Sequence, residues 1–268
     1  MQSAIPVFSN TTADPYPDDI KTAKKILGGH LLYNFVTAIV SAAIALAVIV
    51  FLIFDKNPGC AMAKNNNRKT IALPLASTDG KVSLEQTLAN RRSVRHFNDK
   101  PLTIEQISQL LRAGQGMTDN RGFRTAPSAG ALYPLELYAI IGKAKGIPAG
   151  IYHYNFKDHQ LINIKSGDFR SELCAAGLSQ GAIKKAPITI LIAGVFKRTT
   201  MKYGQRGIQY VLMEAGHVGQ NILLQTVSLG LGAVPIGAFN ENDIIRLMDF
   251  GPDEQPLYLI PVGHLLWN

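Results

Sequence analysis

The chain has 268 residues, of which 47% are hydrophobic, and this composition excludes an intrinsically disordered protein. The formal net charge is +8, and it belongs to the later part of the chain because lysines and aspartates balance in the first 63 residues. A basic domain suits a phosphate-bearing ligand, an anionic substrate or an anionic bilayer surface. No run of Lys and Arg interleaved with aromatics indicates a nucleic-acid partner. With two cysteines, Cys60 and Cys174, the chain offers neither a disulfide framework nor a cysteine metal site.

The first element expected along the chain is a membrane-spanning helix. Leu31 to Phe54 is a predominantly apolar run without a charged residue, and at about 1.5 Å per residue it spans a hydrocarbon core of about 30 Å. A buried core helix is the other interpretation, but such helices are usually amphipathic. We therefore expect a polar segment at residues 1–30 and one transmembrane helix at residues 31–54.

Two short strings after this run resemble processing sites: Ala61-Met62-Ala63 a signal-cleavage site, and Gly59-Cys60 a lipoprotein site. The length of the run and of the segment before it favours a retained anchor over a cleaved signal. Basic residues flank both sides of the run, and their count favours a single-pass protein with its folded domain in the cytoplasm.

The next segment, residues 55–81, contains Asn, Pro and Gly without apolar periodicity, which is typical of a tether. The folded domain is expected at residues 82–268. Ser83 with Gln86, and Thr103 with Gln106, have capping-box spacing. These pairs predict two helices, Leu84–Arg92 and Ile104–Gln115.

The remaining elements mix strands and helices without regular βαβ alternation, which favours an α+β sandwich. A long helix is expected at Tyr203–Leu229, stopped by Gly230 and Gly232, and a last helix at Asn242–Phe250. Strands are expected at 137–141, 188–196, 234–239 and 257–263, and a hairpin pairs 151–154 with 160–164.

Three segments carry residues suited to ligand binding. Arg91-Arg92-Ser93-Val94-Arg95 offers guanidinium groups and a hydroxyl for a phosphate, although a basic helix end is also a common solvated terminus. The small-residue string Ala126–Pro134 allows backbone to approach a flat ligand closely, or forms an ordinary tight loop. Val234–Phe239 offers backbone amides, or is a buried strand.

The long helix contains Glu214 and His217, but two ligands without a third do not make a metal site. Gly216 and Gly219, beside Ala215, fit the close approach of a second helix, as at a dimer interface.

Five strings occur in an order that resembles the nitroreductase superfamily, and within it the SagB/ThcOx-type dehydrogenases. The resemblance covers about Val82 to Gly263 and rests on Arg-Arg-Ser-Val-Arg (91–95), Ala-Pro-Ser-Ala-Gly-Ala-Leu-Tyr-Pro-Leu-Glu (126–136), Lys-Tyr-Gly-Gln-Arg-Gly (202–207), Met-Glu-Ala-Gly-His (213–217) and Pro-Ile-Gly-Ala-Phe (235–239).

This resemblance implies a homodimeric α+β sandwich that binds one FMN per active site at the subunit interface. It implies that Arg91, Ser93 and Arg95 hold the flavin phosphate and ribityl chain. It further implies that Pro127, Ser128 and Gly130 line the isoalloxazine and that Gly237 and Ala238 offer amides near N5; Arg92 and Ile236 complete the expected set. Relatives often have Arg at the position of His264, and a histidine there predicts weaker or pH-dependent phosphate binding.

Lys202-Tyr203 resembles the Lys-Tyr pair that azoline-oxidising members use in catalysis, where a tyrosine beside an ammonium removes a carbon-bound proton. The expected function is an FMN-dependent dehydrogenase that acts by hydride transfer on a small-molecule or peptide substrate. The alternatives are a nitro- or quinone-type reductase fed by NAD(P)H, and a membrane-tethered flavin-binding protein without turnover.

Overall fold

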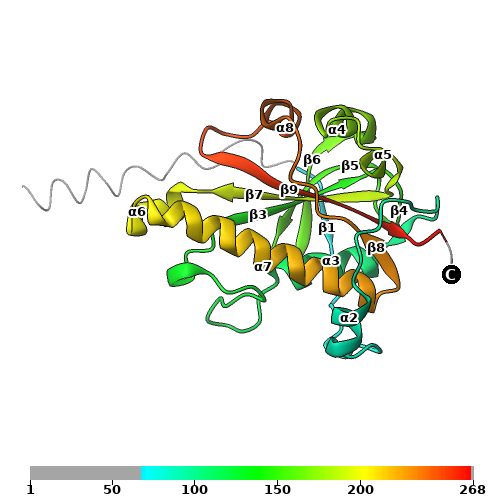
Figure 1. The fold of residues 1–268 in the computed structure, drawn as a ribbon, viewed down its shortest axis with the longest axis horizontal. Helices are drawn as coiled ribbons and strands as arrows, with labels where there is room; N and C mark the ends of the chain where they lie inside the picture. The colour runs from blue at the N-terminus through cyan, green and yellow to red at the C-terminus, as the bar shows by residue number, and fades with distance from the viewer. Residues whose placement is uncertain (1–67, 267–268) are drawn as a thin grey trace, which may run out of the picture. The chain divides into compact units, whose positions relative to one another are not determined.

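A seven-stranded antiparallel sheet forms the centre of the computed structural model, which describes residues 68–266 (Figure 1). The strands lie in the order β1-β6-β5-β3-β7-β9-β8, and a separate pair, β2 and β4, is parallel. The strands are β1 (Thr70–Ala72), β2 (Leu102–Thr103), β3 (Leu135–Ile141), β4 (Ala144–Lys145), β5 (Gly150–Asn155), β6 (Gln160–Ser166), β7 (Ile188–Val195), β8 (Leu231–Ala233) and β9 (Glu254–His264).

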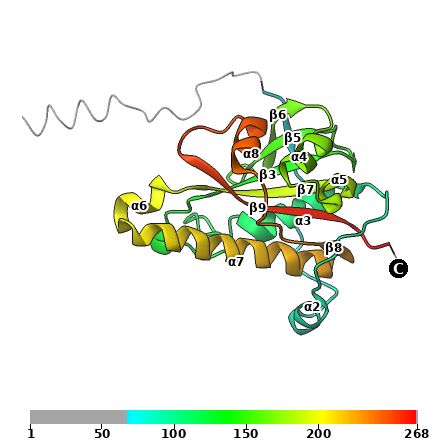
Figure 2. The ribbon, with the colours of Figure 1, turned by 45° about the horizontal axis from the view of Figure 1, so that its top comes forward.

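Helices cover both faces of this sheet (Figures 1 and 2). One face packs against α3 (Ile104–Gln115) and α7 (Arg206–Ser228), and the other against α4 (Arg170–Ala176), α5 (Gly181–Lys185) and α8 (Glu241–Met248). The two short helices α2 (Leu84–Asn90) and α6 (Lys197–Tyr203) lie near opposite ends of α7. The expected α+β sandwich is therefore confirmed.

The central strands β3 and β7 divide their side chains between the two cores. In β3, Leu135, Leu137, Ala139 and Ile141 join the core under α3 and α7, whereas Tyr138 and Ile140 join the core under α4, α5 and α8. This alternation follows from the two-residue repeat of a strand. Because both faces are covered, β3 and β7 are almost continuously apolar, as buried strands are.

The two capping boxes form as expected. Ser83 Oγ accepts from the N–H of Gln86 at 3.2 Å, and Thr103 Oγ1 accepts from the N–H of Gln106 at 3.3 Å. The second helix has its expected bounds, but α2 ends at Asn90, so that Arg91–Arg95 lies beyond the helix.

The predicted tether at residues 55–81 is wrong for its last part. Thr70–Ala72 forms the edge strand β1, which pairs with β6, and Leu73 is buried with its N–H bonded to the carbonyl of His159 at 3.1 Å. The fold therefore includes residues well before Ser83. The polar segment at 1–30 and the anchor expected at 31–54 lie outside the described residues. Within 68–266, no helix combines the length and the apolar character that a bilayer crossing requires.

The expected helix at 203–229 is α7, but it begins at Arg206, because Gly204 with a φ of 55° separates it from α6, a short helix that the sequence interpretation did not predict. At Gly207 a Cβ would lie 2.9 Å from the Cα of Thr200, so the turn between the helices requires glycine. The expected interface role of Gly219 is wrong, because this residue and Ala215 face the sheet, with Ile192 nearest to Gly219. Gly216 faces open space.

The strand expected at 234–239 is reduced to a single bridge between Ile236 and Leu259, and the regular strand β8 precedes it. Proline at 235 lacks the N–H that a ladder needs. The hairpin of β5 and β6 has the expected pairing. Cys174 is a free, buried cysteine.

Candidate functional site

The Arg91–Arg95 segment is extended and lies against the strands that follow α7. Ser93 bridges Ala233, and the N–H of Val94 donates to the carbonyl of Ala233 at 2.9 Å. A Cβ on Gly232 would lie 2.8 Å from the Cβ of Val94, so glycine is what permits this approach. The segment is thereby fixed at the C-terminal end of α7.

Two of the three arginines in this segment have free guanidinium groups. Among the described residues, neither Arg91 nor Arg95 has a side-chain hydrogen bond or ion pair, and Ser93 is exposed. Arg92 differs, because its Nη1 donates to the carbonyls of Ala89 and Arg91 at 3.0 and 2.8 Å. These bonds cap the end of α2, so the geometry favours a structural role for Arg92 over the predicted ligand role.

His264 lies beside this segment, since its carbonyl accepts from the N–H of Asn98 at 3.1 Å. Its side chain is buried and its Nε2 atom has no partner in the described part of the chain. Burial lowers the pKa of His264, and the charge of Lys100 lowers it further, while a hydrogen bond to the backbone of Pro101 opposes the shift. The imidazole is therefore neutral at neutral pH and offers a hydrogen bond instead of a charge.

The loop that contains Pro127, Ser128 and Gly130 meets Lys202 and Tyr203 at the other end of α7. Gly130 has a φ of 63°, and a Cβ there would lie 2.7 Å from Tyr203 Oη and 3.0 Å from Lys202 Nζ. The predicted flavin loop and the predicted catalytic pair are thus in direct contact. Glycine suits this position, because its φ is positive and no Cβ crowds the ends of the two side chains.

The same loop contains two further residues in the left-handed region, Ala131 with a φ of 53° and Tyr133 with a φ of 46°. A residue other than glycine in this region is strained, and such strain is concentrated at functional sites.

Arg198 fixes α6 to this loop and to the sheet. Its Nη1 donates to the carbonyl of Tyr133 at 3.1 Å and pairs with Glu136 Oε1 at 2.6 Å. Glu136 is largely buried, and His153 Nε2 contacts its other oxygen at 2.8 Å. Burial raises the pKa of Glu136, but the contacts with His153 and Arg198 outweigh it and hold the pKa below the usual value. The carboxylate is therefore a charged anchor for the helix that carries Lys202 and Tyr203.

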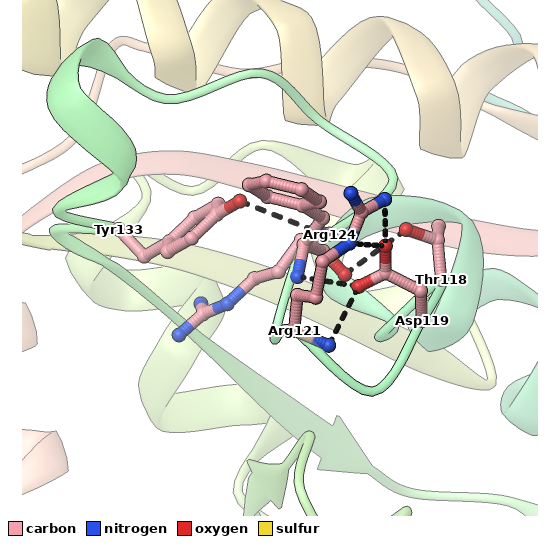
Figure 3. A network of polar contacts seen from close by, with 6 residues as sticks. Thr118, Asp119, Arg121, Arg124 and Tyr133 are labelled. Carbon is pink, nitrogen blue, oxygen red and sulfur yellow. Dashed lines mark hydrogen bonds and ion pairs between the residues drawn. The ribbon is translucent and has the colours of Figure 1, made fainter.

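A buried polar cluster, formed by Gln115, Arg124 and Glu214, lies beneath the loop. Arg124 Nη1 donates to Gln115 Oε1 at 2.7 Å, and its guanidinium carbon lies 4.4 Å from the centre of the Tyr133 ring and 3.6 Å from that of Phe156. Figure 3 shows Arg124 beside Tyr133, whose Oη accepts from the N–H of Arg124 at 3.3 Å. Next to it, Asp119 accepts from Arg121 and orders the preceding turn.

Glu214 of this cluster is buried on α7, whereas His217 is exposed on the same helix. No group of three metal-ligating side chains occurs among residues 68–266. Burial raises the pKa of Glu214 to about 6, and Ser128, Arg124 and Gln115 offset part of the shift.

The segment Ile236–Ala238 presents backbone donors beside β9. The N–H of Ile236 donates a hydrogen bond to the carbonyl of Leu259 at 2.8 Å. The exposed residues Gly237 and Ala238 have amides without a partner in the described part of the chain, and Gln180 Nε2 holds the carbonyl of Ala238 at 2.9 Å. Two amides are therefore available to a ligand, while Ile236 serves the sheet.

The structure thus gathers the predicted residues into separate groups. Arg91–Arg95 and His264 lie at the C-terminal end of α7, and Gly130 with Lys202 and Tyr203 lies at its N-terminal end. The sequence interpretation missed Arg124, Glu136 and Arg198. A charge inside the apolar string Leu135–Ile141 is the signal that could have identified Glu136.

Comparisons with known proteins agree with this geometry. The nitroreductase family model matches residues 88–264. The nitroreductase-like protein MJ1384 of Methanocaldococcus jannaschii is 46% identical over 68% of this chain and 91% of that protein. The Microcin B17-processing protein McbC of Escherichia coli is 27% identical over 72% and 74% of the two chains. An FMN reductase [NAD(P)H] of Bacillus subtilis is 25% identical over 67% and 64%.

Among solved structures, a nitroreductase-like protein of Ralstonia eutropha is similar with a TM-score of 0.66 and 28% identity, over 77% of this chain and 94% of that chain. The family match spans both the Arg91–Arg95 segment and the loop that contacts Tyr203. The chain belongs to the nitroreductase family.

Proposed function

We propose that this protein is an FMN-dependent oxidoreductase, and more specifically a SagB-type dehydrogenase that acts on a small molecule or a peptide. The observation that carries the proposal is the contact of Gly130 with Lys202 and Tyr203, which joins a ligand loop to a pair of proton-handling groups. The relative named an FMN reductase supports the cofactor, and the microcin-processing relative supports the peptide substrate.

The phosphate of FMN fits the Arg91–Arg95 segment. Arg91 and Arg95 have no competing partner in the described residues, and guanidinium groups bind phosphate oxygens through charge-assisted hydrogen bonds. Ser93 adds a neutral donor. His264 would contribute a hydrogen bond through its unpartnered Nε2.

The flavin ring fits the free amides of Gly237 and Ala238. When bound, FMN would accept a hydride from one substrate and pass electrons to another. The two amides would donate to the ring near N5, where negative charge develops during reduction. Tyr203 would move a proton at the substrate carbon, with the ammonium group of Lys202 beside it.

The spacing of these groups supports a homodimer. The 23 residues of α7 extend over roughly 35 Å, more than the length of one FMN molecule, so one copy cannot offer both ends of α7 to the same flavin. In a dimer whose two-fold axis is perpendicular to α7, the two copies of this helix run antiparallel. The Arg91–Arg95 segment of one copy then approaches the Gly130 loop of the other.

The outer side of α7 has the character that such an interface needs. Its exposed positions recur every three or four residues and form one stripe, which consists of Ile208, Gln209, Leu212, Met213, Gly216, His217 and Gln220. Leu212 and Met213 are each about half exposed, and Gly216 meets nothing within 4 Å. Exposed apolar side chains beside a glycine on a helix surface support a protein contact.

A reductase fed by NAD(P)H is the alternative, supported by the name of the Bacillus subtilis relative. The same phosphate and amide groups would serve it, but a nitro or quinone acceptor can take its proton from water. A flavin-binding protein without turnover would also keep those groups. Substitution of Tyr203 therefore distinguishes a dehydrogenase from a reductase fed by NAD(P)H.

Localisation to a membrane rests on residues 31–54, which lie outside the described residues. Their uncharged apolar sequence supports a retained single-pass anchor, with the catalytic domain facing the cytoplasm.

Replacing Arg91 and Arg95 together by Ala should release FMN. Each charge-assisted hydrogen bond contributes roughly 1.5–3 kcal/mol, so the dissociation constant should rise by about two to four orders of magnitude. Fluorescence titration of FMN measures it. The matched control is Lys184→Ala with Lys185→Ala, which removes two charges from α5. Equal flavin affinity in both double variants would show that the phosphate lies elsewhere.

Leu212→Asp should separate the dimer, because each copy would bury an unpaired carboxylate in the interface. Light scattering coupled to size-exclusion chromatography measures the mass, and FMN absorbance reports the loss of cofactor. Leu75→Asp, at a residue 95% exposed, is the control and should leave both unchanged. A Leu212→Asp variant that remains a flavin-bound dimer contradicts this interface.

Tyr203→Phe should lower turnover of a dehydrogenase substrate by about 10² to 10⁴, the usual contribution of a positioned proton-transfer group. Stopped-flow absorbance separates flavin reduction from substrate turnover, and flavin content should stay constant. Tyr210→Phe is the control, because its ring packs 5.2 Å from that of Tyr203. An unchanged rate with Tyr203→Phe would favour the NAD(P)H-fed reductase, whereas loss of flavin would make the residue structural.

The full-length chain should remain with membranes after carbonate extraction, and a chain shortened to begin at Lys64 should be soluble and yellow. Cell fractionation with mass determination checks both. Full-length protein recovered in the soluble fraction at its unprocessed mass would end the anchor hypothesis.

A further inference from the structure

The short helix α6, which carries Lys202 and Tyr203, is attached to the rest of the domain by a single polar side chain. It has seven residues and no side-chain N-cap, and Thr199 is its one buried residue. A helix this short is marginal in water unless tertiary contacts hold it. Among the described residues, Arg198 is the only residue of α6 whose side chain forms a hydrogen bond or ion pair with another element.

Arg198 joins two neighbouring elements through one atom. Its Nη1 lies 2.6 Å from Glu136 Oε1 of β3 and donates to the carbonyl of Tyr133 at 3.1 Å. Strand β3 is paired on both sides, so Glu136 is a rigid point of attachment, and His153 Nε2 lies 2.8 Å from its other oxygen. One carboxylate thus fixes the guanidinium that holds both α6 and Tyr133.

This ion pair differs from an ordinary surface pair. Exposed pairs contribute little because water screens them, but the side chain of Glu136 is only 13% exposed. Without Arg198, His153 would be the one side-chain partner left to this carboxylate in the described part of the chain. Removing a partner from a buried charge is costly. The contact therefore constrains α6, although the side chain of Arg198 is itself 41% exposed.

Arg198 and Lys202 lie on the same face of α6, because residues four apart in a helix are neighbours on its surface. That face meets the turn at two points: Arg198 bonds the carbonyl of Tyr133, and Lys202 Nζ lies 3.0 Å from where a Cβ on Gly130 would be. Tyr133 is strained, with a φ of 46°, and such a residue persists only where its surroundings hold it. A single guanidinium group thus supports the strained turn and the helix that faces it.

We propose that Arg198 is a positioning residue that sets the distance between the Gly130 turn and the Lys202–Tyr203 pair. Its effect on catalysis rests on the proposed function, whereas its effect on the local structure does not. Arg198 acts through the two elements that it joins and not through contact with the substrate.

Three substitutions separate this role from a general contribution to stability. Arg198→Met has a similar length but neither the charge nor the donors. Arg198→Lys keeps a charged donor, and because one nitrogen makes both contacts, an ammonium group with three donors can replace it. Lys197→Met is the matched control, because it removes an exposed cation from the adjacent position of α6.

Hydrogen exchange in the flavin-free full chain tests the structural part. The amides of Thr200 and Gly204 in α6, and that of Tyr133 in the turn, are all hydrogen-bonded. Arg198→Met should lower the protection of these three amides at least tenfold, whereas the amides of β7 should keep theirs. Arg198→Lys should stay within threefold of wild type, and Lys197→Met should equal it.

Turnover of a synthetic peptide with one thiazoline ring, measured at saturating FMN, tests the catalytic part. Arg198→Met should lower kcat at least tenfold with a KM within threefold of wild type, and Arg198→Lys should recover most of this loss. In the Tyr203→Phe background, Arg198→Met should lower kcat less than threefold. The reason is that a positioning residue acts only through the group that it positions.

Two kinds of result would overturn the inference. The first is wild-type protection of the three amides in Arg198→Met, or an equal loss of protection across β7. The second is a loss of kcat that is undiminished in the Tyr203→Phe background. A wild-type protein that does not turn over the thiazoline peptide contradicts the proposed dehydrogenase function instead. The exchange measurement then still decides the structural role of Arg198.

Discussion

The packing of α7 on the sheet is the constraint on which the rest of this structure depends. Its inner side buries Val211, Ala215, Val218 and Ile222 in the core shared with β3, β7 and β9. Gly219 faces Ile192 and Ile260 without a side chain of its own. This burial fixes where the two ends of the helix lie. The Gly130 loop is thereby fixed near one end and the Arg91–Arg95 segment near the other.

The N-terminal end of α7 is built at some cost in stability. Two residues other than glycine adopt positive φ, and a carboxyl, an amide and a guanidinium have buried atoms without partners. Each unsatisfied buried group costs about 1–3 kcal/mol. Sites that violate local rules in this way are usually functional, because the surrounding core must compensate for them.

The C-terminal end of α7 is built differently. There the chain uses glycine instead of strain: Gly232 admits Val94, and Gly263 admits Phe97, whose atoms would lie 2.8 Å from an added Cβ. The extended segment from Ser93 to Asn98 is thereby held by backbone bonds to Ala233 and His264. The side chains of Arg91 and Arg95 have no partner among the described residues and remain available for a ligand. The C-terminal end of α7 thus presents a positively charged edge, and the N-terminal end presents a strained loop beside proton-handling groups.

Local sequence patterns determined several helices and strands of this protein. The capping boxes at Ser83 and Thr103 predicted two helix starts, because the spacing of a side chain and its target amide lies within one turn. Apolar runs predicted β3 and β7, and the family strings identified the ligand segments. Only tertiary structure decided the rest. The edge strand β1 has only three residues, and it exists because β6 offers a partner. Other features also depend on residues far apart in the chain. They are the contact of Gly130 with Tyr203, the burial of Glu214 and the ion pair by which Arg198 anchors α6. No local pattern encodes such contacts, because they depend on how the helices pack on the sheet.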